Sequence, residues 1–435
     1  MKKIFYFIVM ALAMAVGFSA CSHEEDDLFG ESAAQRLNKS VDKYQDLLKS
    51  SEKGWVMEFL PSDGSYGGYV YTAKFTDEDV TLVCDLSLYS STEEWPAGTE
   101  LTSKYSVKAE QGVILTFDTY NLLLHFFSEP RGSSDVDGYE SDYEFVFMKT
   151  SENQDTIYLR GKKYGNILKM YKLKDSDSKT FINQTVDMAS SLSLVNYQYL
   201  TVNGKDYPVD IEGKTFYIND IDSEDDTEIE KPMFYTPEGF HLYEPIQIGG
   251  KTFQYFKYDA ATGNIVADDG QSTIALPSVT DQFLNPKGKW HFDGDDMSEG
   301  IQKLYDALPN YSSSYTFEGA SIGNSTTTSD LAKGYDKVIS IEWSLEFWGM
   351  SFSSYANYGI EMTYDESQGT IDFKGLGEGY GFSAAAKKKV AAPFVNAILD
   401  NAPYKATFND GKIKKQAKLV STKDPSVWFT LNLGD

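Results

Sequence analysis

The strongest constraint on the fold is a succession of short segments rich in β-branched and aromatic residues, separated by turn-forming stretches and by no helical pattern. Nine such segments run from Trp55 to Leu173: Trp55–Leu60, Tyr69–Phe75, Val80–Leu86, Lys104–Val107, Val113–Phe117, Leu122–Phe127, Tyr143–Met148, Thr156–Leu159 and Ile167–Leu173. Strands at this spacing predict an antiparallel meander that closes into a barrel or a strongly curved sheet.

A helix is expected before these strands. Ser32 with Gln35 forms a possible capping box, and Gly54 marks the expected end of the helix. Between them, apolar residues recur at helical spacing: Leu37, Val41, Tyr44 and Leu48. We expect this stripe to pack on the strands that follow.

The chain after Leu173 is also expected to be rich in β-strands. Lys174–Lys179 leads through a short helix to a second β-rich block, in which Asn203-Gly204 predicts a type I′ hairpin turn. Turn residues between Pro277 and Gly288 mark another boundary, and a helix is expected from about Ala384 to Asp400. The fold class is therefore mainly β (α+β), with antiparallel meander or barrel-like sheets and a few amphipathic helices.

These patterns divide the chain into five parts. A lipoprotein signal peptide is expected at 1–20, an acidic tether at 21–30, and an N-terminal helix with an antiparallel β domain at 31–175. A second β-rich block follows at 176–285, and a C-terminal α+β domain at 286–435.

The N-terminus resembles that of a bacterial lipoprotein. Lys2 and Lys3 precede an apolar run from Ile4 to Ala20, which is short for a membrane span and fits a secretory signal. The run ends in Phe18-Ser19-Ala20-Cys21, which resembles a lipobox with Phe18 in place of the usual Leu or Val. This resemblance implies that Cys21 is acylated; the alternative is an ordinary signal peptide with an incidental cysteine.

The residues after Cys21 refine the expected location. Ser22-His23-Glu24-Glu25-Asp26-Asp27 is similar to the signal that sends lipoproteins of Bacteroidota to the outer leaflet of the outer membrane. A charge run also serves as a solvated tether, and both interpretations can hold. We therefore expect an outer-membrane, lipid-anchored protein that faces the cell exterior.

The charged and reactive residues exclude several functions and identify no catalytic group. With 39 Lys+Arg against 65 Asp+Glu, the chain has a net charge of −26, which disfavours nucleic-acid binding. It contains no H-E-x-x-H, G-x-S-x-G or Walker A motif. His125, expected on a strand, is interpreted as a structural histidine, and Cys84 as a small buried hydrophobe without a disulfide partner. Whether the protein is an enzyme stays open, and a non-enzymatic protein is favoured.

Cofactors are not expected, although calcium is an alternative. Three acidic stretches could supply oxygen ligands: Asp135-Val136-Asp137-Gly138, Asp222–Glu230 and Asp293-Gly294-Asp295-Asp296. None matches a complete calcium loop, so solvated acidic loops are the preferred interpretation.

The aromatic residues suggest a binding surface. The chain has 30 Tyr, 27 Phe and 6 Trp. Sugar rings present apolar C–H faces that stack on exposed aromatic side chains. The candidate binding residues are Trp95, Trp348, Tyr355 and Tyr358, with burial in a β core as the alternative for each; Trp55, Trp290 and Trp343 are expected to be core anchors.

Several stretches form a distinctive set: Asp27-Leu28-Phe29, Ser32–Leu37, Gly54-Trp55, Gly67-Gly68-Tyr69, Leu115–His125, Asp142–Phe145 and Leu159–Lys163. Together they resemble domain-of-unknown-function family 4302, a family of Bacteroidota lipoproteins. The resemblance is specific over about 25–175 and looser to about 280. It implies a place beside TonB-dependent transporters and their substrate-capturing lipoprotein partners, and so surface nutrient capture.

The leading hypothesis is therefore a surface-exposed outer-membrane lipoprotein that acts as an accessory binding protein, for glycan or peptide capture, in a nutrient-uptake system. One alternative is a secreted hydrolase, either a glycosidase or a peptidase; another is a structural or adhesive component of the uptake complex. A deep cleft with paired, pKa-shifted carboxylates would indicate the hydrolase, and an aromatic surface would indicate binding.

Overall fold

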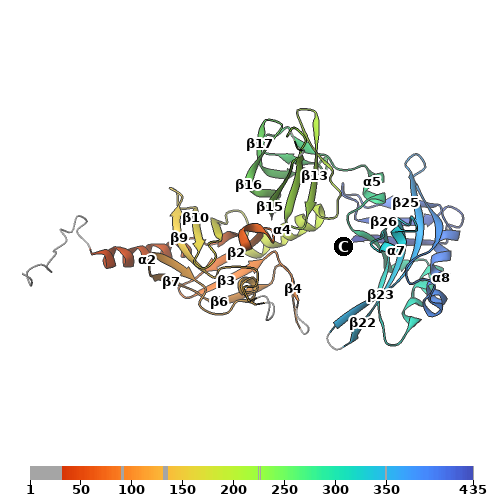
Figure 1. Ribbon diagram of the computed structural model, residues 1–435, viewed down its shortest axis with the longest axis horizontal. Helices are drawn as coiled ribbons and strands as arrows, with labels where there is room; N and C mark the ends of the chain where they lie inside the picture. The colour runs from red at the N-terminus through yellow and green to blue at the C-terminus, as the bar shows by residue number, and fades with distance from the viewer. Residues whose placement is uncertain are drawn as a thin grey trace, which may run out of the picture.

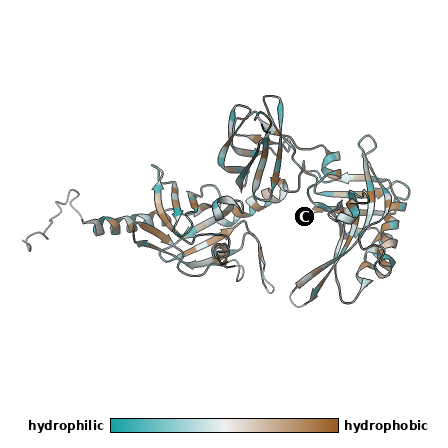
Figure 2. Cartoon of the chain, viewed as in Figure 1, coloured by the Kyte–Doolittle hydropathy of each residue, from teal (hydrophilic) through white to brown (hydrophobic). Residues whose placement is uncertain are grey.

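The computed structural model describes residues 32–89, 93–130, 136–223, 225, 227–347 and 350–434. These fold into a curved nine-stranded sheet followed by two closed eight-stranded barrels, all antiparallel (Figure 1). Hydrophobic and hydrophilic residues alternate along many of the strands, so each unit encloses its own apolar core (Figure 2). The predicted mainly β fold with a few helices is confirmed.

In the first sheet, the first strand along the chain pairs with the last one. Its strands, in order across the sheet, are β6 (Glu100–Lys104), β3 (Asp79–Cys84), β2 (Tyr69–Phe75), β1 (Trp55–Phe59), β11 (Ile167–Lys172), β10 (Thr156–Gly161), β9 (Glu144–Thr150), β8 (Val113–Thr116) and β7 (Ser106–Ala109). A small hairpin, β4 (Leu88–Tyr89) with β5 (Glu94–Trp95), projects from it. All five residues of β1 are buried, because both faces of the sheet are covered at this strand.

The expected N-terminal helix is α2 (Ala33–Lys49), with the predicted capping box in place. The Ser32 N–H donates to Gln35 Oε1 at 3.0 Å, and the Gln35 N–H donates to Ser32 Oγ at 3.3 Å. Leu48 is fully buried against the sheet. The helix ends at Lys49, before Gly54, and β1 begins at Trp55. The Trp55 indole N–H donates a hydrogen bond to the Leu48 carbonyl at 2.7 Å.

The prediction of a strand at Leu122–Phe127 is wrong, because the segment begins with the short helix α3 (Leu122–His125). The Asn121 side chain caps this helix by accepting the Leu123 N–H at 3.2 Å. Leu123 and Leu124 are consecutive and both buried in the same core. A strand would point them to opposite faces, whereas a helical turn lets both contact one core.

The second unit begins with helix α4 (Ser178–Leu192), which is capped by Asp177 accepting the Thr180 N–H at 3.0 Å. The barrel after it consists of β12 (Tyr199–Val202), β13 (Lys205–Glu212), β14 (Thr215–Asp220), β15 (Thr227–Thr236), β16 (Gly239–Ile248), β17 (Lys251–Tyr258), β18 (Ile265–Ala267) and β19 (Thr273–Ile274). Asn203 and Gly204 both have positive φ, +51° and +80°, between paired strands β12 and β13. The predicted type I′ turn is confirmed.

The third unit is a second barrel decorated by helices. Its strands are β20 (Lys289–Met297), β21 (Thr316–Asn324), β22 (Lys337–Phe347), β23 (Met350–Asp365), β24 (Thr370–Glu378), β25 (Tyr404–Phe408), β26 (Gln416–Ser421) and β27 (Trp428–Gly434). Its helices are α5 (Val279–Leu284), α6 (Glu299–Tyr305), α7 (Thr328–Leu331) and α8 (Ala385–Asp400). Across the described part of the chain, no helix combines the length and the apolar character needed to cross a membrane.

The predicted tryptophan anchors lie in the cores. Trp55, Trp290 and Trp343 are at most 1% exposed. Each indole N–H donates to a backbone carbonyl, so the one polar atom of the buried side chain has a hydrogen-bond partner. The second barrel contacts the first through its β25–β26 loop, which places Ile413 in the core cluster of the first barrel.

Candidate binding trough between the first sheet and the first barrel

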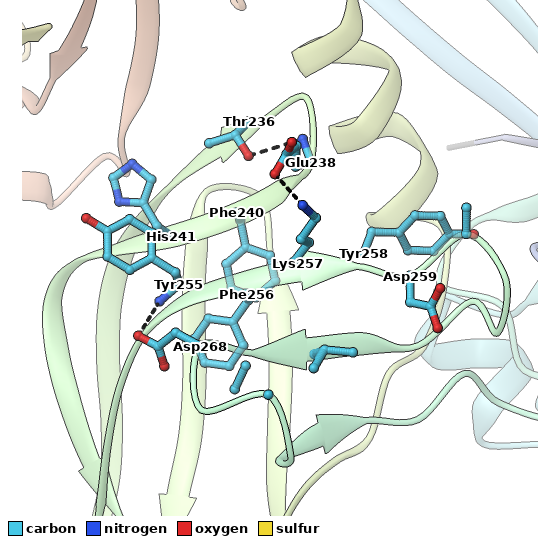
Figure 3. Close-up of a pocket in the computed structure, with 14 residues that line it drawn as sticks. Thr236, Glu238, Phe240, His241, Tyr255, Phe256, Lys257, Tyr258, Asp259 and Asp268 are labelled. Atoms are coloured by element: carbon cyan, nitrogen blue, oxygen red, sulfur yellow. Dashed lines mark hydrogen bonds and ion pairs between the residues drawn. The ribbon is translucent and has the colours of Figure 1, made fainter.

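Two hollows meet where the first sheet contacts the first barrel. The larger has a volume of about 1380 Å³ and is lined by residues of β1, β10, β11, α4 and the first barrel. The smaller, about 530 Å³, lies on β16, β17 and β18 (Figure 3). Both are lined by Thr236, Glu238, His241 and Tyr255, so they form one continuous depression, which we call the trough.

A buried ionic cluster lies at the centre of the trough. His241 Nε2 lies 2.9 Å from Glu58 Oε1, and Lys169 Nζ donates to Glu58 Oε2 at 2.9 Å. His241 Nδ1 lies 3.2 Å from the Leu242 carbonyl. Both ring nitrogens therefore face hydrogen-bond acceptors.

The electrostatics of the cluster keep Glu58 ionised. Burial alone would raise the pKa of Glu58, but the hydrogen bond and charge of His241, together with Lys169, outweigh burial and hold the pKa below its usual value. A carboxyl whose pKa is lowered by its hydrogen-bonding partners is poorly suited to donate a proton. It is well suited to fix the positions of the groups around it.

Cross-strand neighbours hold the His241 ring in place. Its centroid lies 5.3 Å from that of Phe234, at an interplanar angle of 29°, and 5.3 Å from that of Tyr255, at 32°. The two partners come from β15 and β17, on either side of β16. The barrel therefore presents His241 and Tyr255 together on its outer surface, facing the first sheet.

Tyr255 is the exposed aromatic side chain of the trough, with 51% of its surface accessible. Its backbone N–H donates to Asp268 Oδ2 at 3.3 Å, and nearby Lys257 pairs with Glu238 at 2.8 Å (Figure 3). On the sheet side, Lys169 Nζ lies 5.4 Å from the centroid of the Tyr171 ring. The trough thus combines an exposed ring with charged groups on both walls.

Two further acidic side chains line the trough and have lowered pKa values. Asp155 pairs with Lys174 at 2.9 Å, a hydrogen bond that lowers the pKa of Asp155, and the backbone of Thr180 lowers the pKa of Asp177. In the part of the chain that the structure describes, every carboxyl with a resolved shift has a lowered pKa.

Three of the predicted binding residues lie in the described part of the chain, one on the hairpin that projects from the first sheet and two in the second barrel. Trp95 on β5 is half-buried and packs against the core of the first sheet. Tyr358 packs inside the second barrel with its ring 5.3 Å from that of Phe382, whereas Tyr355, three residues earlier on β23, faces the other side of the strand. Cys21, the 1–20 signal, the 21–30 tether and Trp348 lie outside the described residues.

Sequence reasoning missed Glu58, Lys169, His241 and Tyr255. Glu58 and Tyr255 interrupt otherwise apolar or alternating strands, a weak signal that many surface positions share. Whether these residues contribute to a site depends on which strand of the other unit lies opposite them.

The remaining polar candidates have structural partners. His125 is half-buried with Nδ1 3.0 Å from the Asn121 carbonyl, and burial lowers its pKa. Asp293 Oδ2 accepts a hydrogen bond from Asn432 at 2.9 Å, which ties β20 to β27. Asp135 lies outside the described residues, within which no group of three or more His, Cys, Asp or Glu is placed to hold a metal ion.

Taken together, the fold defines a class: an antiparallel β protein of three units whose first two enclose a shared trough. The sequence profile of the domain of unknown function DUF4302 matches residues 25–260, more than half of the chain, and the chain belongs to that family. The matched region contains the first sheet, α4 and most of the first barrel, and therefore most of the residues that line the trough. The second barrel lies outside it.

Other comparisons add little. No curated protein matches the chain. The DNA polymerase sliding clamp from Caulobacter crescentus is 8% identical with a TM-score of 0.12, covering 92% of this chain and 98% of the clamp. The clamp from Bacillus subtilis is 10% identical with a TM-score of 0.13 and coverages of 91% and 96%. A porin-like protein from Bacteroides uniformis is 7% identical with a TM-score of 0.09 and coverages of 88% and 96%. At these scores the likenesses carry no argument.

Proposed function

We propose that the protein is a lipid-anchored protein of the outer bacterial surface that captures an extended nutrient polymer, a glycan or a peptide, in the trough. The observation that carries the proposal is the exposed Tyr255 ring beside the Glu58–His241 pair, in a hollow of about 1380 Å³ shared by two units. A hollow of this volume exceeds an ordinary small-molecule pocket, which suits a polymer segment.

The chemistry of the walls favours a glycan. The apolar face of a sugar ring can stack on Tyr255, while Lys257, Glu238 and Asp268 around it offer donors and acceptors to hydroxyl groups. Rigid fixation of His241 between two aromatic rings keeps this surface preorganised, which lowers the entropic cost of binding.

The location and the partners rest on the N-terminal sequence and on the family. An acylated Cys21 followed by an acidic stretch supports display on the outer leaflet of the outer membrane, in a lipoprotein of Bacteroidota. At that site, a TonB-dependent transporter and its substrate-capturing lipoprotein are the partners to which a captured polymer would pass.

Calorimetric titration of purified polysaccharides and of casein peptides into the chain from Ser22 onward tests this function. Stacking on one ring contributes about 1–2 kcal/mol by analogy with base–aromatic stacking. Tyr255→Ala should therefore weaken binding of the active polymer roughly tenfold, since about 1.4 kcal/mol is a factor of ten. Tyr199→Ala is the matched control, because Tyr199 is 48% exposed on the same barrel but does not line the trough.

Equal affinities for the wild type and Tyr255→Ala would exclude the trough as the glycan site. Turnover of any polymer in the panel would replace the binding function with the hydrolase.

A further inference from the structure

Strands β22 and β23 extend beyond the second barrel as a two-stranded arm (Figure 1). The pairing of β21 with β22 reaches only Thr316↔Ser344, and the pairing of β24 with β23 ends at Tyr358↔Glu378. We call residues 345–347 and 350–355 the arm. An isolated two-stranded hairpin is marginally stable in water, and a third strand or a packed face is what stabilises such a ribbon.

One face of the arm is apolar and the other is polar. Cross-strand pairs Leu345↔Phe352 and Phe347↔Met350 continue the inward face that Trp343 presents to the barrel core. Pairs Ser344↔Ser353 and Glu346↔Ser351 form the opposite face.

The apolar face is open to solvent. Phe347 is 57% exposed, Met350 55% and Phe352 46%. In the described chain, Phe347 and Phe352 are the only exposed phenylalanines. A cluster of exposed apolar side chains of this kind marks an interaction site.

The outer edge of β23 is also available for pairing. Asn357 directs both its N–H and its C=O away from β22, toward Tyr380 and Gly379. Because this direction alternates along an antiparallel strand, Ser353 and Ser351 direct theirs to the same outer edge. From Met350 to Ser354 no strand of the described chain lies beside that edge.

We propose that the arm is a self-association surface, in which the β23 edges of two copies of this chain pair antiparallel across a twofold axis. An antiparallel edge is complementary to itself under twofold symmetry, so a second copy supplies every missing hydrogen bond. The same pairing places Met350 and Phe352 of both copies on one continuous apolar face of a four-stranded sheet.

Two observations favour a protein partner over a lipid surface. The open backbone groups of the β23 edge would stay unsatisfied in hydrocarbon, whereas a paired strand satisfies them. Residues 339–357 also contain no Lys or Arg, the residues that attract anionic lipid, and the whole chain has a net charge of −26. That charge opposes dimerisation only at long range, where salt screens it.

Sedimentation velocity of the chain from Ser22 onward, between about 1 and 100 µM, tests the proposal. The wild type should show a reversible dimer whose dissociation constant falls at least severalfold as NaCl rises from 0.05 to 0.5 M, conditions chosen to span the screening range. Ser353→Pro should abolish it, because proline removes an outward N–H that the monomer does not use. Ser353→Thr is the matched control and should still dimerise.

A second variant keeps the test valid if the proline disturbs the arm. Phe347→Ser with Phe352→Ser should weaken dimerisation at least tenfold while circular dichroism stays unchanged. A wild type that is monomeric at every concentration would overturn the proposal, as would dimers that persist in both Ser353→Pro and the double serine variant. Flotation of the wild type with phosphatidylcholine vesicles, lost in the double serine variant, would assign the arm to a lipid surface instead.

Discussion

His241 Nε2 lies 2.9 Å from Glu58 Oε1, although 183 residues separate the two in the sequence. This contact joins β16 of the first barrel to β1, a central strand of the first sheet. Lys214 of the barrel forms a second ion pair with the nearly buried Asp85 of the sheet. These two contacts join the first sheet to the first barrel.

Replacing Glu58 with Gln should lower the free energy of unfolding by about 3–5 kcal/mol at pH 7, because Lys169 would lose a buried counter-charge and His241 would lose a charged hydrogen-bond partner. Urea unfolding measures the change. The matched control is Glu244→Gln, whose partner Lys231 forms an exposed pair and whose loss should cost less than about 1 kcal/mol. Equal losses in the two variants would show that the buried cluster is not coupled to folding.

The same residue predicts a pH dependence. The folded-state pKa of Glu58 lies below its ordinary value of 4.5, so its stabilisation is complete above that pH and is lost as the pH falls through the folded-state pKa. Wild-type stability should therefore decline below about pH 4.5. The decline should be shallower in Glu58→Gln, as measured by urea unfolding at a series of pH values; parallel curves would contradict the assignment.

Gly68→Ala should destabilise the contact between the first sheet and the first barrel. A Cβ at this position would lie 2.6 Å from the Met233 carbonyl oxygen and 2.7 Å from the Phe234 ring, so one of the units must move. Overpacking of this kind costs about 1–3 kcal/mol. Gly300→Ala is the control, because nothing lies within 4 Å of its Cβ position on α6. A stability loss in the control as large as in Gly68→Ala would refute the steric explanation.

Trp95→Ala should reduce stability rather than polymer affinity. Trp95 packs on the core of the first sheet, and removing a half-buried indole should cost about 1–3 kcal/mol. Tyr89→Ala on the paired strand is the control, since Tyr89 is 70% exposed. A tenfold loss of polymer affinity without a change in melting temperature would restore Trp95 as a binding platform.

Leu48→Ala should detach α2 from the first sheet. Leu48 is fully buried in the core cluster, and truncating a buried leucine costs about 2–5 kcal/mol. Thermal unfolding measures the loss, with the exposed Lys43→Ala on the same helix as control. If both variants melt with the wild type, the helix does not contribute to the core.

Radiolabelled palmitate should label the wild type and Cys84→Ala but not Cys21→Ser. Cys84 is buried, and burial raises the pKa of its thiol, so it does not compete as an acylation site. The Cys21→Ser protein should also leave the membrane fraction. Label retained in Cys21→Ser would mean that the lipobox interpretation is wrong.

The parts of the fold that were predictable are those whose signal is local. The capping box of α2 and the Asn203-Gly204 turn each lie within a few residues, and the physical chemistry of those residues suffices to specify them. The run Leu122–Phe127 was not predictable, because five apolar residues and one histidine fit a strand or a helical turn equally well. The Asn121 cap and the burial of both Leu123 and Leu124 decided it.

The sequence by itself determined that the chain forms antiparallel β structure, because alternating burial and turn chemistry act between near neighbours. Only the tertiary structure decided where a site lies. Glu58 and Lys169 belong to one unit and His241 and Tyr255 to another, and no periodicity links residues that far apart. These residues come together only when the two folded units pack against each other. That packing is the sum of many weak contacts, which no short stretch of sequence encodes.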